Sequence, residues 1–388
     1  MGNNWKTYRL ADIASIKTGP FGSLLHEKDY KDFGTPIITV EHLSEQGIVH
    51  KNLPLISEED KNRLKSYILK EGDIVFSRVG SVDRSSIISS KENGWLFSGR
   101  LLRVRPNSHI VDSEFLNQYF HQSFFKHNMR SLAVGGTMPS LNTQILASIY
   151  VKLPSLKEQK EIATILSTWN KIIEKTENLI KAKNIFYISL VKKFINEANI
   201  LSKYFVNDLF NLGRGRVISK NYIENNPGSY PVYSSQSQNN GELGRIKTYD
   251  FDGKYITWTT DGANAGTVFY RNGKFNCTNV CGIAKLKVNN KIDLRYIAIY
   301  LQTITKNYVS YVGNPKLMNN IFGSIPLPLP AYNYQNKVAN VIFTLKEEII
   351  ILEKLKSSLV KQKQGLMQKL LTGEWQVNLD QEFKEWVV

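Results

Sequence analysis

One heptad pattern occurs twice in this chain and limits its possible folds more than any other feature. Between Pro154 and Phe194, apolar residues recur in alternating steps of four and three, and the pattern returns 176 positions later, between Pro330 and Leu370. This spacing places an apolar seam along one side of a helix, so it predicts two long helices packed as a coiled coil. The residues expected to pack in the seam are Ile162, Leu166, Trp169, Ile173, Ile180, Leu190, Val338, Ile342, Leu345, Ile349, Leu352, Leu359, Leu366 and Leu370.

The seam also has polar positions, and these are staggered between the two copies. Thr176, Lys183 and Tyr187 in the first copy correspond to Leu352, Leu359 and Lys363 in the second. The alternative interpretation is a pair of unrelated surface helices with ordinary amphipathic faces. An unbroken register over about 40 residues favours the coiled coil.

The globular segments that precede the two helices repeat as well. Strands are predicted at 74–76 and 255–258 and again at 101–105 and 283–288, and helices at 112–125 and 293–301. Asn93-Gly94 and Asn272-Gly273 each lie between apolar runs, which predicts a β-hairpin in each segment. The segments end alike, with Pro139 matching Pro315 at the same offset. The sequence therefore predicts an internal duplication of a globular segment followed by a helix.

This order of segments predicts an α+β protein with two pseudo-repeated α/β domains separated by two long antiparallel helices. The domains are expected at 1–153 and 200–330, the helices at 154–199 and 331–374, and a C-terminal tail near the first domain at 375–388. The second helix must run back along the first, because the second domain leaves one helix and returns to start the other. An approximate two-fold axis would relate the halves, and 40 residues at about 1.5 Å each give a spacer of roughly 60 Å.

Composition indicates where such a protein works and what it binds. The net charge of the 388 residues is +16, and residues 200–330 alone carry +8, so a folded basic surface predicts a polyanionic partner. Cys277 and Cys281 are the only cysteines, and they lack further ligands at zinc spacing, so buried thiols are favoured over a metal site. No signal peptide and no membrane-spanning apolar run are evident, which predicts a cytoplasmic protein without a membrane partner.

Polar and basic side chains on the predicted loops favour double-stranded DNA as the partner. Two similar domains on a rigid spacer suit two half-sites, and the half-sites should differ because the loops of the two domains differ. Arg suits guanine, Asn or Gln suits adenine, and Lys, Ser and Thr mostly contact phosphate. The candidates are Lys17, Ser23, Arg78, Ser81, Arg84, Ser85, Arg100, Arg214, Arg216, Lys220, Gln236, Asn239, Asn240, Arg245, Thr260, Asn264, Arg271 and Asn279. Replacing Arg271 with alanine is expected to affect one half-site only.

Motifs of common nucleic-acid enzymes are not found in the sequence. It contains no Pro-Pro dipeptide of an amino-methyltransferase loop, no Pro-Asp dipeptide of a common nuclease motif and no Walker-type phosphate loop. Asp261 could act as an acid, but no partner carboxylate is evident, so a role in loop structure is favoured. We therefore expect no catalytic residues, metal site or bound cofactor in this chain.

Several motifs together resemble the specificity subunit of type I restriction–modification systems over nearly the whole chain. They are the run from Gly72 to Ser81, Leu153-Pro154 followed by Glu158-Gln159 and Ile162-Ala163, and the run from Gly365 to Gly373. The second copy departs from the first at Tyr334, which stands where the first has Glu158. The two helix starts are therefore not expected to make identical partner contacts.

The resemblance implies partners and a target that composition does not show. It implies two target-recognition domains that read a bipartite DNA sequence with unread base pairs between the halves. It also implies two modification subunits, which carry S-adenosylmethionine, and two restriction subunits in the full complex. Two other classes stay open at this stage, namely a stand-alone nuclease or methyltransferase with an unrecognised active site and a basic RNA- or protein-binding adaptor.

Overall fold

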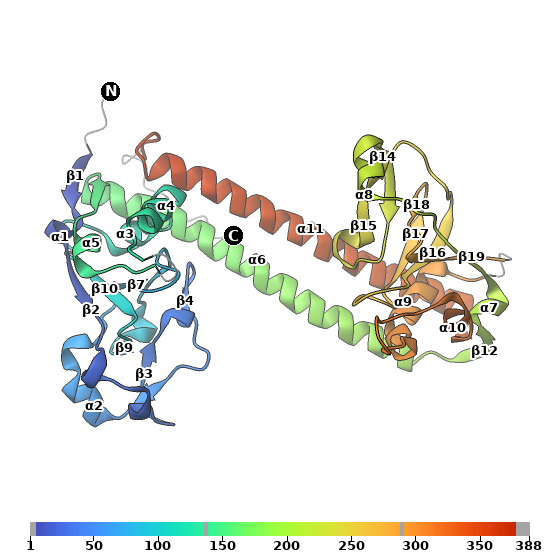
Figure 1. Cartoon of the computed structure of the whole chain (residues 1–388), viewed down its shortest axis with the longest axis horizontal. Helices are drawn as coiled ribbons and strands as arrows, with labels where there is room; N and C mark the ends of the chain where they lie inside the picture. Colours follow the sequence, from blue (N-terminus) through green and yellow to red (C-terminus); the bar gives the residue numbers. More distant parts are fainter. Residues whose placement is uncertain (1–4, 136–138, 288–290, 378–388) are drawn as a thin grey trace. The chain divides into compact units, whose positions relative to one another are not determined.

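A computed structural model describes residues 5–135, 139–287 and 291–377 of the chain. The chain divides into two compact units, Met1–Glu177 with Lys354–Val388, and Asn178–Glu353. Figure 1 labels their helices and strands. None of the helices in the described ranges is long and apolar enough to cross a membrane.

The first unit is built on a four-stranded antiparallel sheet. Its order is β2 (Ala14–Thr18), β10 (Leu101–Pro106), β7 (Ile74–Ser77) and β8 (Ser85–Ile87). A smaller sheet has β3 (Thr35–Ile38) between β6 (Leu55–Ile56) and β9 (Leu96–Phe97), and β9 runs parallel to β3. A third pairing joins β1 (Lys6–Arg9) to β11 (Tyr150–Leu153). The remaining elements are α1 (Leu10–Ile13), β4 (Leu43–Ser44), β5 (Gly47–Ile48), α2 (Glu58–Arg63), α3 (Ser113–Phe120), α4 (Ser123–Leu132) and α5 (Thr143–Ala147).

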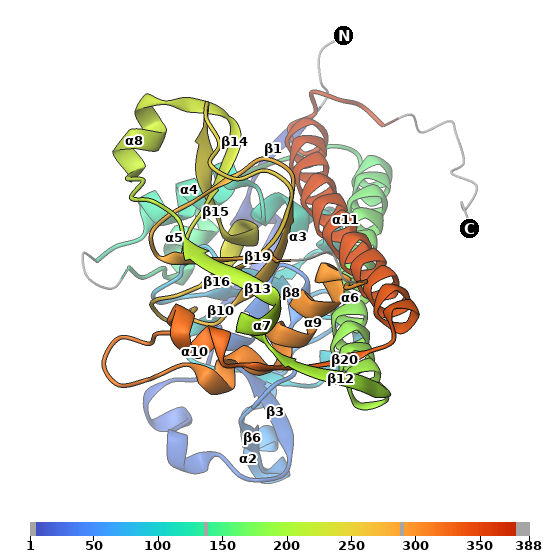
Figure 2. The same cartoon turned by 90° about the vertical axis from the view of Figure 1, so that its right-hand side faces the viewer.

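The second unit repeats the main sheet, the small sheet and the terminal strand pair of the first, whereas the β4–β5 pairing has no counterpart among the strands described in the second unit. Its main sheet has the order β13 (Phe210–Arg214), β19 (Cys281–Leu286), β16 (Lys254–Thr259) and β17 (Val268–Asn272). The small sheet has β14 (Pro227–Tyr233) between β15 (Glu242–Ile246) and β18 (Asn276–Cys277), and β18 runs parallel to β14. Strand β12 (Ile200–Phe205) pairs with β20 (Pro326–Pro330), as Figure 2 shows, and α9 (Leu294–Ile304) contacts β16 and β17. The unit also contains α7 (Val206–Leu209), α8 (Lys220–Asn225) and α10 (Asn319–Gly323). The predicted duplication and the α+β class are confirmed.

The two predicted long helices are present as α6 (Leu156–Asn196) and α11 (Tyr332–Leu370). In the first unit, Ile162 and Leu166 near the start of α6 share a core with Met367 and Leu370 near the end of α11. In the second unit, Val191 near the end of α6 shares a core with Val338 near the start of α11. The helices therefore run antiparallel, as the order of segments predicted.

The predicted seam residues lie on the inner faces of these helices. All of them are at least half-buried, and the most deeply buried are Ile162, Leu166, Ile173, Val338, Ile342, Leu345, Ile349 and Leu370. Ion pairs also join the two helices, with Lys356 Nζ 3.1 Å from Glu177 Oε2 in the first unit and Lys183 Nζ 2.6 Å from Glu348 Oε2 in the second. The tail residue Val377 packs against the core of the first unit. Residues 378–388 lie outside the described ranges, so the position of the rest of the tail stays a prediction.

A buried glutamine fixes each long helix to the domain that precedes it. Gln159 is buried, its Oε1 accepts a hydrogen bond from the Asp112 amide, and its Nε2 donates to the carbonyls of Pro154 and Ile110. Gln335 repeats the arrangement, accepting from the Asp293 amide. Because a buried amide must be satisfied, each glutamine ties its helix start to the N-terminus of the helix that its domain contributes, α3 or α9.

The prediction of one β-hairpin in each unit is wrong. Gly94 and Gly273 do have positive φ angles of 89° and 102°, as tight turns require. The strands on either side of each turn, however, pair with other strands. Strand β8 pairs with β7 and β9 with β3, while β17 pairs with β16 and β18 with β14. Each turn therefore carries the chain from the main sheet to the small sheet.

Candidate nucleic-acid interface

The loop after β7 in the first unit and the loop after β16 in the second unit are held by the same pattern of backbone hydrogen bonds. In the first unit, Leu141 N donates to Arg78 O and Gly80 N donates to Pro139 O. In the second unit, Leu317 N donates to Thr260 O and Gly262 N donates to Pro315 O. The frame of the loop is thus common to the two units, while its side chains differ. Arg78 stands at the position that Thr260 has in the second unit.

Arg78 lies where three loops of the first unit meet. Its backbone N–H donates to the Arg100 carbonyl at 2.8 Å, and its guanidinium lies 3.4 Å from the Gly99 carbonyl and 5.6 Å from the centre of the Phe21 ring. Phe21 is 61% exposed, and Arg100 is exposed as well. An exposed aromatic ring beside two arginines can stack on a base or pack against a sugar while the guanidiniums contact phosphate or guanine.

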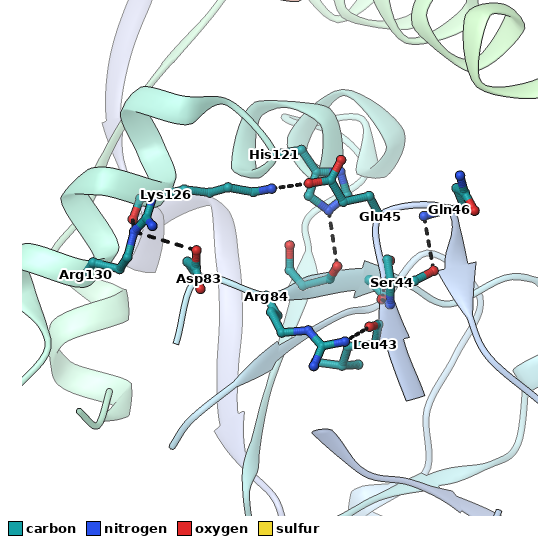
Figure 3. Close-up of polar contacts among 11 residues, drawn as sticks. Leu43, Ser44, Glu45, Gln46, Asp83, Arg84, His121, Lys126 and Arg130 are labelled. Atoms are coloured by element: carbon teal, nitrogen blue, oxygen red, sulfur yellow. Dashed lines mark hydrogen bonds and ion pairs between the residues drawn. The ribbon is translucent and has the colours of Figure 1, made fainter. Parts of the chain in front are cut away.

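Arg84 belongs to the loop after β7, and part of its guanidinium is hydrogen-bonded within the protein. Its Nη2 donates to the Leu43 carbonyl at 2.6 Å, and the neighbouring Asp83 lies 3.6 Å from Arg130 on α4. Figure 3 shows these contacts, together with the Lys126 ammonium directed at the Glu45 carboxylate beside His121. Arg84 is still exposed, so it can contact a ligand with its other nitrogens.

Lys17 lies at the end of β2 in a cluster of cations. Its ammonium donates to the Ser66 carbonyl at 3.1 Å and lies 4.3 Å from the centre of the Tyr67 ring. Burial, followed by the charges of Arg103 and Arg105, lowers the pKa of Lys17. Asp73 compensates for one of these charges through two hydrogen bonds from Arg105, each 2.7 Å long. Binding of an anion here would relieve the remaining repulsion.

Two predicted serines of the first unit differ in accessibility. Ser81 is exposed on the loop after β7. Ser85 was expected on an exposed loop, and that expectation is wrong because it begins β8 and is only 2% exposed. The side chain of Ser23 lies outside what the structure describes.

In the second unit, three polar loops are joined by side-chain hydrogen bonds. Ser234 Oγ lies 2.9 Å from Thr278 Oγ1, and Ser237 Oγ donates to Asn264 Oδ1 at 3.1 Å. These contacts bring the segment before β15, the loop after β16 and the turn between β18 and β19 together. The predicted residues Gln236, Asn239, Asn240, Asn264 and Asn279 all belong to these loops, and Asn239, Asn240 and Asn279 are exposed.

Serine and threonine residues that connect these loops were missed by the sequence analysis. Ser234, Ser235, Ser237 and Thr278 all make bonds between loops, and Ser235 Oγ donates to the Asp261 carbonyl. The run of polar residues from Ser234 to Asn240 was the available signal. Asp261 itself accepts a 2.5 Å hydrogen bond from Thr260 Oγ1, which is a contact within the loop.

Arg271 and Thr260 are buried, although both were expected to be exposed. Arg271 is 3% exposed, and its guanidinium lies 3.5 Å from the centre of the Tyr233 ring and 4.3 Å from that of Phe269. It donates to Thr257 Oγ1 at 3.1 Å and to the Asn240 carbonyl at 2.9 Å. Asn239 and Asn240 have φ angles of 48° and 52°, a conformation that non-glycine residues seldom adopt. Arg271 thus holds this strained turn from inside the domain.

Basic residues at the edges of the second unit are mostly paired. Arg216 Nε donates to Asp250 Oδ2 at 2.9 Å, and Arg245 Nε donates to Glu242 Oε1 at 2.8 Å. These two arginines, Arg214 and Lys220 are all exposed. Exposed ion pairs are weak in water, so a phosphate can replace the carboxylate at little cost.

The two cysteines lie together in the interior of the second unit. Cys277 and Cys281 are buried, their Sγ atoms are 3.5 Å apart, and burial raises the pKa of the Cys277 thiol well above its usual value. Within residues 5–135, 139–287 and 291–377, no three His, Cys, Asp or Glu side chains are grouped to hold a metal ion.

Comparison with known protein families agrees with the duplicated fold. The model of the type I restriction modification DNA specificity domain matches residues 2–182 and 201–362. Each match includes one globular segment and most of one long helix.

Curated relatives and solved structures come from the same group of proteins. A putative type I specificity subunit of Mycoplasma pneumoniae is 39% identical over 220 residues, which cover 54% of this chain and 80% of the relative. The MpnII specificity subunit of the same organism is 46% identical over 152 residues, covering 39% of this chain and 46% of the relative.

The crystal structure of a type I S subunit from M. genitalium matches with a TM-score of 0.68 at 16% identity, covering 95% of this chain and 96% of that one. A chain from a structural study of type I complex assembly and conformational transition matches with a TM-score of 0.57 at 12% identity, over 96% of this chain and 98% of that one. At these identities the structural likeness shows the fold.

Proposed function

The chain belongs to the family of type I restriction–modification DNA specificity proteins, and on that basis we propose that it reads a bipartite DNA sequence. One half-site would be read by the loops around Arg78 and Arg100, and the other by the loops around Asn240 and Asn264. The observation that carries this proposal is the pair of loops held by identical backbone bonds but bearing different side chains. A shared frame with different contact residues suits two half-sites of different sequence.

The proposal assigns binding and positioning to this chain and catalysis to its partners. Two modification subunits would carry S-adenosylmethionine and methylate adenine, and two restriction subunits would join the full complex in the cytoplasm. The motifs of methyltransferases and nucleases are absent from the sequence, which supports a non-catalytic role. The DNA would then be the substrate, and the partner subunits would supply the catalytic residues and S-adenosylmethionine.

An exposed apolar face on the long helices supports docking of a protein partner. In the second unit, Leu179 and Phe186 lie seven residues apart on α6 and are 45% and 56% exposed. On α11 of the same unit, Ile351 is 63% exposed. Exposed apolar side chains seven residues apart lie on the same side of a helix, and such a stripe suits a protein interface. We propose that a modification subunit covers this face.

The DNA-binding proposal is tested by selection from random duplexes with the modification subunit present. We expect enrichment of one split sequence, and at least tenfold tighter binding to it than to random DNA at physiological salt. The affinity should fall as salt rises, because phosphate contacts release counterions. Equal binding to every duplex would contradict the proposal.

Replacement of Arg271 with methionine should weaken recognition of one half-site only. Methionine can fill the space between Tyr233 and Phe269, so the domain should remain folded, but the Asn240 turn loses the hydrogen bond that holds it. We expect about a fivefold loss of discrimination at the half-site of the second unit, on the scale of one hydrogen bond of about 1 kcal/mol. Competition binding with DNA changed in one half or the other measures this. An equal loss for both halves, or none for either, would show that the turn takes no part in reading.

A further inference from the structure

The first unit contains a cavity that the proposed DNA-binding loops do not use. Its volume is about 860 Å³, and it lies between the Glu45–Gln46 segment, the start of α4, and the α6 and α11 portions of this unit. Its walls include Lys126, Lys363 and Phe124. A cavity of this size is in the range of those that hold small organic ligands.

Lys363 is the unusual member of the lining. It occupies a polar position of the heptad seam and is only 8% exposed. Among the described residues, no hydrogen bond or ion pair is made by its ammonium. Glu45 is the nearby acid that attracts it, but the Glu45 carboxylate already forms an ion pair with Lys126. An ammonium that is largely desolvated and has no partner in the protein is stabilised by a counter-charge, which an anion in the cavity would supply.

The remaining lining residues favour an anion. Lys126, Lys361 and Lys363 face a single acidic residue, Glu45, so the lining carries two positive charges in excess. His121 adds no charge near neutral pH, because burial lowers its pKa to about 4. Gln122 Nε2 is a buried donor without a partner among the described residues.

We propose that this cavity binds a phosphate-bearing small molecule, with the Lys363 ammonium as its principal counter-charge. A phosphate monoester carries close to two negative charges at neutral pH, which matches the excess of the lining. Lysine is a common phosphate ligand and acts as a point charge. The apolar side chains of Phe124 and Val360 on the same walls give the organic part of the ligand a surface to pack against.

The test measures binding of inorganic phosphate and of adenosine 5′-monophosphate to the full-length chain by calorimetry at constant ionic strength, with adenosine as the uncharged probe. We expect saturable binding of at least one phosphate probe and no binding of adenosine. Tighter binding of the nucleotide than of inorganic phosphate identifies an organic phosphate as the ligand class. Equal binding of the two identifies free phosphate. Absence of binding by both probes up to millimolar concentration would overturn the proposal.

A pair of variants on one helix locates the site. Lys363→Met should lower phosphate affinity at least tenfold, whereas Lys354→Met, which removes an exposed lysine of α11 outside the cavity, should change it less than twofold. Without phosphate, the melting temperature of Lys363→Met should equal or exceed that of the unmodified chain, because methionine removes a largely desolvated charge from the helix seam. Unchanged phosphate affinity in Lys363→Met would overturn the assignment.

A second measurement on the unmodified chain covers the possibility that Lys363→Met does not fold. Phosphate should slow acetylation of Lys363 severalfold, as measured by mass spectrometry, and leave the rate at Lys354 unchanged. Equal rates at Lys363 with and without phosphate would overturn the proposal. These results do not depend on DNA, so failure here is distinguishable from failure of the proposed DNA reading.

Discussion

Replacement of Trp258 with alanine should lower the free energy of unfolding by about 3–5 kcal/mol, the range measured when large aromatic residues are removed from protein cores. Trp258 is fully buried in β16, and its ring stacks on Phe322 with a centroid distance of 3.7 Å and an interplanar angle of 2°. Its Nε1 donates to the Leu317 carbonyl at 3.0 Å. Gly282 on the next strand has no side chain, and any Cβ there would overlap the Trp258 ring.

Urea unfolding of the two proteins measures the loss, and hydrogen exchange shows where it occurs. The amides of β16 and β19 should lose most protection, since Trp258 joins this sheet to the Leu317 segment. Trp375→Ala is the matched control, because Trp375 is 51% exposed and its removal should cost less than about 1 kcal/mol. A loss below that value for Trp258→Ala would mean that the surrounding side chains close the cavity.

Acidification below pH 6.5 should destabilise the protein through His121. Burial lowers the pKa of His121 from 6.5 to about 4, with Lys126 and Lys363 adding to the effect and Glu45 opposing it. A proton therefore binds the unfolded chain more tightly than the folded one. The stability due to neutral His121 is complete above pH 6.5 and is lost as the pH falls toward 4. Each pH unit in this window costs about 1.4 kcal/mol, so we expect a loss of about 2 kcal/mol between pH 7 and pH 4.5.

Urea unfolding across this pH range, compared between variants, isolates the histidine. His121→Gln should flatten the dependence between pH 6.5 and 4.5, while His109→Gln, at an exposed position, should leave it unchanged. Protonation of Glu45 affects stability only at lower pH. Burial raises its pKa, but the hydrogen bond from Lys126 and the charge of His121 outweigh this effect, so its pKa is lowered. A dependence that survives in His121→Gln would assign the destabilisation to other groups.

The long helices and the duplication could be predicted because burial on a helix is periodic. Residues such as Ile162 and Val338 face a core at every third or fourth position, so the spacing alone identifies the seam. The strands β7 and β16 could be predicted from short runs rich in apolar and aromatic residues, Ile74-Val75-Phe76 and Tyr255-Ile256-Thr257-Trp258. These features depend on local sequence and a regular backbone.

The hairpins could not be predicted because turn residues specify a backbone angle and not a partner. Asn93-Gly94 and Asn272-Gly273 set the positive φ that a turn needs. Whether the flanking strands then pair depends on distant strands that compete for them. Here β3 and β14 take up β9 and β18 in parallel pairs, which no local signal reveals.

Residue type was also a poor guide to exposure at the candidate interface. The sequence predicts Arg271 as a DNA contact from its chemical type, because arginine suits guanine, yet it lies on β17 with its side chain between two aromatic rings. Ser85 and Thr260 were misplaced for the same reason. Lys363 shows the converse, since it is a lysine at a polar position of the helix seam and is buried. The position of a residue within a helix or strand therefore determines its exposure more than its chemical type does.

The division of α6 and α11 between two cores determines how the protein should melt. Each helix has one end in the first core and the other end in the second. If one core opened alone, about 20 residues of each helix would be left without a partner, and isolated helices of that length are only marginally stable in water. Heat should therefore not release one half of the protein while the other stays intact, and a single cooperative transition is the behaviour to expect from a chain whose halves share their two longest elements.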